Sequence, residues 1–157
     1  MKRGMTLIES IMVVILMGIM AFVFSVFILE GADAWRFITV QNNLALSSRA
    51  AVYIMAREIK RIKDVASLTT YASTEVAFTD VDNNPVAFRQ SGAYLMRNSD
   101  VLLKKLKFPG GLFISYLNAS GHQTATRDEI RTINIHVIVE DGTNRFIVDT
   151  AARLRNL

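Results

Sequence analysis

The chain has 157 residues and a net charge of +4, a length that suits one globular domain together with a membrane anchor. Hydrophobic residues make up 51% of it, and one apolar run near the N-terminus raises that share. Lys2 and Arg3 precede the run, so a chain without them would carry +2, and the basic balance is a poor argument for a nucleic-acid partner. Because there is no Cys, no disulfide supports the domain.

The apolar run extends from Ile11 to Leu29 without a charged residue. As a helix it would be about 28 Å long, which is enough to cross the hydrocarbon core of a bilayer. Lys2 and Arg3 lie on its N-terminal side, so the positive-inside rule places the N-terminus in the cytoplasm. The residues after the run are then expected on the other side of the membrane.

Glu9 stands at the beginning of this run, where a carboxylate is unfavourable. A charged group in the middle of a bilayer costs about 3 kcal/mol on insertion scales, and less near the interface, so a partner is expected. A cut after Gly4 would create one, the free α-amine of Met5. The Glu9 carboxylate could pair with such an amine on a neighbouring helix, or with its own amine four residues away.

A short basic leader, Gly4, the segment Met5-Thr6-Leu7-Ile8-Glu9 and the apolar run resemble the N-terminal signal of type IV pilins and type II secretion pseudopilins. The resemblance implies cleavage after Gly4 by a prepilin peptidase, N-methylation of Met5, and Glu9 as the assembly carboxylate. The family usually has Phe where this chain has Met5. The implied partners are other pilins or pseudopilins and an assembly platform in the bacterial inner membrane.

Two other interpretations of the N-terminus remain open. A secretory signal peptide has an apolar core of about 7–15 residues and a cleavage site with small residues, whereas this run is longer and is followed by Glu30-Gly31-Ala32-Asp33. A plain membrane anchor explains the apolar run equally well, but it explains neither Glu9 nor the Gly4–Met5 junction.

Helical spacing continues after the membrane run. No Pro occurs between Gly31 and Val65, and one apolar stripe follows spacings of three and four through Val52, Met55, Ile59 and Ile62. We therefore expect a leader over residues 1–4, a transmembrane and assembly half of the helix over 5–30, an amphipathic half over 31–65, and an extracytoplasmic β domain over 66–157.

Short alternating segments separated by turn residues indicate strands in the last part of the chain. The clearest one runs from Thr132 to Glu140 and forms a hairpin with Arg145–Leu154 across Asp141-Gly142-Thr143-Asn144. Other candidate strands are Glu75–Thr79, Val86–Arg89, Ala93–Arg97, Val101–Leu103 and Leu112–Leu117. The expected fold is α+β and pilin-like, with a long N-terminal helix packed on an antiparallel sheet.

Later segments resemble one subgroup of the family, the J-type pseudopilins and W-type minor pilins. They are Met55-Ala56-Arg57-Glu58-Ile59-Lys60-Arg61-Ile62, Ala93–Arg97 and the closing Arg153-Leu154-Arg155-Asn156-Leu157. This resemblance implies a minor subunit at or near the tip of a filament, held in the inner membrane before assembly. Secretion, motility, adhesion and DNA uptake share this machinery, and the residues do not separate them.

Other residue patterns give little chemistry. Asp80, Asp82 and Asn84 imitate the start of a calcium loop, but Pro85 stands where Gly is required, so we interpret them as a polar hairpin turn. His122 and His136 share no metal-binding motif, and we expect no metal, no cofactor and no catalytic residue.

A cluster of Lys104, Lys105 and Lys107 next to Phe108 is the candidate contact for DNA or a surface, which gives the alternative function of a binding module at a pilus tip. The competing interpretation is a solvated strand edge on which Lys discourages pairing. A third alternative for the whole protein is an unprocessed, single-span anchored domain.

Overall fold

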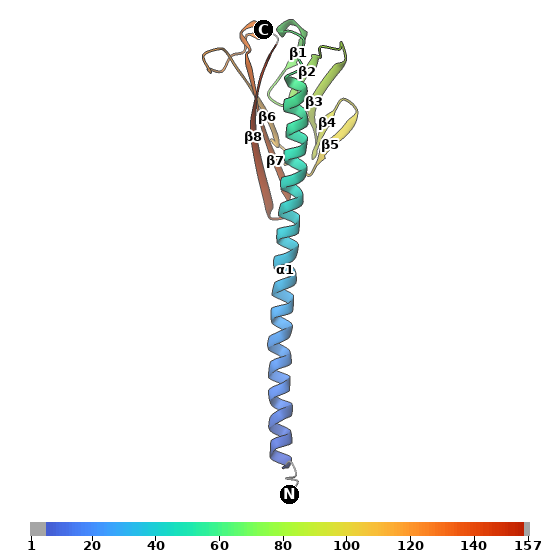
Figure 1. Cartoon of the computed structure of the whole chain (residues 1–157), viewed down its shortest axis with the longest axis vertical. Coiled ribbons are helices and arrows are strands. Elements are labelled where there is room, and N and C mark those ends of the chain that lie inside the picture. Colours follow the sequence, from blue (N-terminus) through green and yellow to red (C-terminus); the bar gives the residue numbers. More distant parts are fainter. Residues whose placement is uncertain (1–5, 156–157) are drawn as a thin grey trace. The chain divides into compact units, whose positions relative to one another are not determined.

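A computed structural model describes residues 6–155, and these residues form one long helix and two antiparallel sheets (Figure 1). The chain divides into two compact units, Met1–Thr39 and Val40–Leu157. The helix α1, Leu7–Ile59, supplies the described part of the first unit apart from Thr6, and its residues from 40 onward belong to the second. The expected α+β class is confirmed, but there are two sheets where the sequence led us to expect one.

The first sheet has five strands in the order in which they occur in the chain, each antiparallel to the next. They are β1 (Leu68–Tyr71), β2 (Glu75–Thr79), β3 (Pro85–Ser91), β4 (Tyr94–Arg97) and β5 (Asp100–Lys104). The second sheet has three antiparallel strands in chain order, β6 (Leu112–Leu117), β7 (Thr132–Asp141) and β8 (Asn144–Arg153). Short 3-10 helices lie at Val65–Ser67 and Arg127–Glu129.

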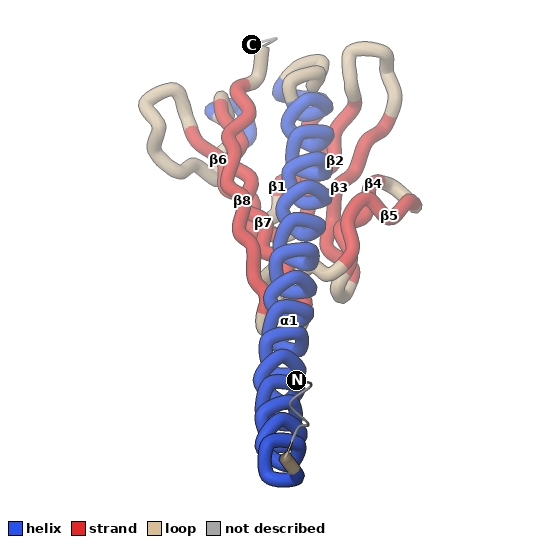
Figure 2. Tube along the Cα trace, turned by 60° about the horizontal axis from the view of Figure 1, so that its bottom comes forward, coloured by secondary structure: helices blue, strands red, loops and turns tan. Residues whose placement is uncertain are grey.

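Within the second unit, the helix lies across both sheets, with β6–β8 to its left and β2–β5 to its right in the view of Figure 2. The helix presents the predicted apolar stripe to them, since Val52, Met55, Ile59 and the following Ile62 are all buried. One core cluster joins this stripe to Phe78 and other buried side chains of both sheets. The apolar stripe of the helix therefore packs against both sheets, as expected for an amphipathic helix at a protein core.

The helix ends at Ile59, six residues earlier than the sequence led us to expect. The N–H groups of Arg61 and Ile62 donate to the carbonyls of Glu58 and Ile59, so the last turn tightens into a three-residue spacing. Ile62 then forms an isolated β-bridge with Asp80. This bridge draws the chain into the first sheet, and helical periodicity alone does not reveal it.

Candidate assembly interface

The apolar run of α1 is exposed throughout among the residues that the structure describes. One helix among the described residues is long and apolar enough to cross a membrane; its most apolar window has a mean hydropathy of 3.0, and none of that window is buried. Side chains such as Leu7, Phe22 and Ile28 are 81%, 71% and 70% exposed. Soluble proteins rarely expose a continuous apolar surface of this size, so it requires lipid or other protein helices as its surroundings.

Glu9 folds back over the first turn of this helix. Its Oε2 atom accepts a hydrogen bond from the Thr6 backbone N–H at 2.9 Å and one from the Thr6 hydroxyl at 3.1 Å. The Glu9 N–H donates in return to the Thr6 hydroxyl oxygen at 3.4 Å. This reciprocal arrangement is a capping box, and it satisfies donors that a helix start otherwise leaves without partners.

The capping box changes the account of Glu9 that the sequence suggested. From the sequence we expected the Glu9 carboxylate to pair with a terminal amine, whereas in the structure it accepts two hydrogen bonds from Thr6. The pattern Thr6-x-x-Glu9 before an apolar run is the sequence signal for such a cap. The predicted cleavage and methylation residues, Gly4 and Met5, lie outside the described residues. The Thr6 nitrogen that donates to Glu9 belongs to the peptide bond between Met5 and Thr6.

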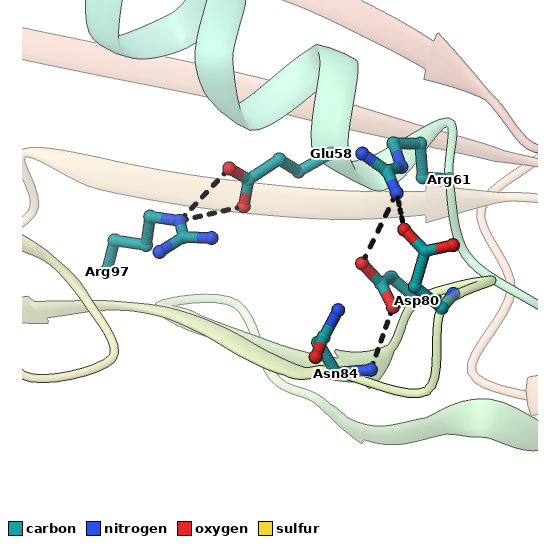
Figure 3. A network of polar contacts seen from close by, with 6 residues as sticks. Glu58, Arg61, Asp80, Asn84 and Arg97 are labelled. Carbon is teal, nitrogen blue, oxygen red and sulfur yellow. Dashed lines mark hydrogen bonds and ion pairs between the residues drawn. The ribbon is translucent and has the colours of Figure 1, made fainter.

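A polar network lies at the other end of the helix (Figure 3). The Arg97 Nε donates to both carboxylate oxygens of Glu58, at 3.0 and 2.9 Å, and so ties the last helical turn to β4. Arg61 pairs with the Asp82 carboxylate and lies 3.7 Å from that of Asp80. These ion pairs surround a pocket of about 480 Å³, but the charges of its lining cancel, so we interpret the network as a clamp between helix and sheet.

The turn between β2 and β3 is organised by Asp80, which is 8% exposed. Its Oδ1 accepts hydrogen bonds from the backbone N–H groups of Asp82 and Asn84, at 2.9 and 2.8 Å. This agrees with the interpretation of the segment as a polar hairpin turn. The part of the chain that the structure describes contains no group of three or more His, Cys, Asp or Glu side chains arranged to hold a metal ion.

Acid is expected to destabilise this domain, partly through Asp80. The backbone N–H of Asn84 holds the pKa of the Asp80 carboxyl below its ordinary value, and Arg61 adds to the effect. A lowered folded-state pKa stabilises the fold above the unfolded value of about 4, and this contribution is lost as pH falls through the folded value. The Tm of the detergent-solubilised full chain should therefore fall between about pH 5 and pH 3.

Asp80→Asn is expected to flatten that dependence, because an amide oxygen can still accept the two backbone bonds but does not titrate. Circular dichroism of thermal unfolding at each pH measures the slope. A variant with the same slope as the unmodified chain would remove Asp80 from the explanation.

The three lysines of the candidate DNA contact lie at the end of β5, an edge strand of the first sheet, and in the segment that follows it. Lys105 pairs with the Asp141 carboxylate, and the Lys107 Nζ lies 3.9 Å from a carboxylate oxygen of Glu140. Lys104 is exposed at the end of the strand. Two of the three cations are thus balanced by nearby acids, which reduces the charge that the cluster can offer to phosphates.

The second sheet brings a Ser, a His and an Asp side chain close together, although their spacing in the sequence does not indicate a site. On one face of β6–β8, the His136 Nδ1 pairs with the Asp149 carboxylate across the strands, and Ser115 lines the same shallow pocket. The strand register explains why His136 meets Asp149, since His136 lies directly opposite Phe113 on β6 and Asp149 on β8. Within the described residues no hydrogen bond joins Ser115 to His136, so the group lacks the contact that activates a nucleophile.

No family model matches the chain, and neither the comparison with curated proteins nor that with solved structures finds a match.

Proposed function

We propose that this protein is a pilin-like structural subunit, of a type IV pilus or a type II secretion pseudopilus, that is processed between Gly4 and Met5. The observation that supports the proposal is the wholly exposed apolar run of α1, with Glu9 in its first turn. Such a helix is stable in lipid before assembly and among other apolar helices afterwards. The exchange of lipid for protein gains little hydrophobic free energy, so packing and ion pairing set the geometry.

The proposal also assigns a topology and a place in the filament. The N-terminus lies in the cytoplasm, the second unit lies outside the inner membrane, and the mature subunit joins at or near the filament tip. The J-type and W-type resemblances suggest this place, and the clamp between Glu58 and Arg97 links two of the segments that carry them. An adhesive or DNA-binding tip module is the less supported candidate, because acids balance two of its three lysines.

Gly4→Leu is expected to block maturation, because the peptidase would meet a bulky side chain at the bond that it cuts. Intact-mass analysis of the membrane-extracted protein measures the result. The wild-type protein should begin at methylated Met5, whereas the Gly4→Leu variant should keep its first four residues. An unmodified chain that still begins at Met1 would exclude the proposed function and leave the plain anchor.

A further inference from the structure

The part of α1 that belongs to the second unit carries a strongly basic outward face. Arg49, Tyr53 and Arg57 follow one another at spacings of four residues on one side of the helix, and Lys60 comes three residues later, directly after the helix end at Ile59. All four residues are exposed, Tyr53 by 68%. We call these four residues the basic helix face.

The basic helix face borders a groove of about 400 Å³ against β8. Val148 and Thr150 form the strand side of this groove, and Arg155 adds a fourth cation. Asp149 is the acid at the rim, and its carboxylate is already occupied by His136. Arg49 lies over the ring of Phe146, with its guanidinium carbon 5.5 Å from the ring centre.

The groove gathers several cations that have no acid within ion-pair distance in the described part of the chain, whereas unpaired cations elsewhere, such as Arg89 and Lys104, do not line it. Arg61, Arg97 and Lys105 each lie beside a carboxylate. Among residues 6–155, none of the four cations in the groove has a carboxylate partner within ion-pair distance. Four cations and the one carboxylate of Asp149 leave an excess of positive charge around the groove, which an acidic partner would balance.

We propose that the basic helix face docks a different filament subunit whose apposed surface carries carboxylates. This inference rests on the proposed function, since it names a neighbour in the assembly. Arg and Tyr are the residue types that dominate binding energy at protein interfaces, and here they alternate.

A second copy of the chain is a poorer occupant. If two copies met through the same face, their cations would oppose each other. Beyond Glu9 in the first turn, the exposed acids of α1 are Glu30 and Asp33, which gives two carboxylates against four cations. A nucleic acid is also less suitable, because a single exposed aromatic ring offers only one stacking platform along the groove.

Charge reversal tests the docking directly. Arg49→Glu with Arg57→Glu is expected to reduce the amount of this protein in sheared filaments at least tenfold, while the mature N-terminus and the circular dichroism spectrum stay unchanged. Arg49→Lys with Arg57→Lys should retain incorporation, and Lys104→Glu with Arg89→Glu, which changes the net charge by the same amount at two exposed residues of the first sheet, serves as the control. Reversal variants that enter filaments as well as the unmodified chain would overturn the inference.

A zero-length cross-link tests the chemistry of the partner and does not depend on filament formation. A water-soluble carbodiimide activates a carboxylate, the Lys60 amine attacks it, and an amide forms as the carbodiimide leaves as a urea. In intact membranes we expect mass spectrometry to find Lys60 joined to an Asp or Glu of another protein. Lys60→Arg should abolish this product but retain incorporation.

Three results of the cross-linking would overturn the inference: no Lys60 product, a product with Glu30 or Asp33 of a second copy, or a product that added oligothymidylate removes. If the Lys60 product forms while the wild-type protein is absent from filaments, the proposal of an acidic partner is kept and the proposed function as a filament subunit is lost. The two failures are therefore distinguishable.

Discussion

Glu9→Ala is expected to leave the protein in the membrane but to reduce its incorporation into filaments at least tenfold. The apolar run that drives insertion is unchanged by the substitution, and removing a charge favours the lipid environment. The variant loses the carboxylate that would pair with an N-terminal amine and so fix one subunit against the next. An immunoblot of sheared filaments, compared with the membrane fraction of the same cells, measures the effect.

The capping box requires a control, because Glu9→Ala also removes the acceptor of two Thr6 hydrogen bonds. Loss of a helix cap costs about 1 kcal/mol and could impair assembly by loosening the first turn. Thr6→Ala keeps the carboxylate but removes the hydroxyl that takes part in the cap, and it should assemble nearly normally. Equal losses in the two variants would assign the effect to capping, and normal assembly of Glu9→Ala would contradict the ion-pair mechanism.

Most strands were predictable because their apolar residues alternate. Val137 and Val139 are buried while His136 and Glu140 are partly exposed, and a period of two in the sequence already shows this. The strand β1 was missed because Leu68-Thr-Thr-Tyr71 is short and contains one fully buried apolar side chain. A shift in its register with β2, between Leu68 and Thr70, further blurs the alternation.

The division into two sheets was not predictable in the same way. Alternation identifies a strand but does not name its neighbour, and β5 and β6 follow each other in the chain without pairing. The segment between them leaves the first sheet and bridges to the second, where Leu106 meets Val139. Only long-range contacts fix this path.

The candidate site shows the same limit. The apolar run and Glu9 are visible in the sequence because both lie within one local pattern. The groove beside the basic helix face was missed, because it combines helix residues with Arg155 from the far end of the chain. Neither segment suggests an anion partner alone, since Arg57 and Lys60 look like the solvated side of an amphipathic helix.

Gly111→Ala is expected to destabilise the second unit by about 3 kcal/mol, the upper part of the usual range for overpacking. A Cβ atom on this residue would lie 2.3 Å from the Lys107 carbonyl oxygen and 2.7 Å from the Lys107 nitrogen. Neither atom can move freely: the Lys107 N–H donates to the Ile138 carbonyl, and the Gln90 amide donates to the Lys107 carbonyl. Relief of the clash must therefore break the crossing between the sheets.

Thermal unfolding of the full chain in detergent measures this effect, and 3 kcal/mol corresponds to a fall in Tm of about 6–12 °C for a protein of this size. Gly31→Ala is the matched control, since a Cβ there meets no atom within 4 Å and Ala favours the helix. A Gly111→Ala variant with an unchanged Tm would mean that the Lys107 segment can shift away from β6. In that case Gln90, whose side-chain oxygen also accepts from the Leu112 N–H, would not hold the two sheets in a fixed relation.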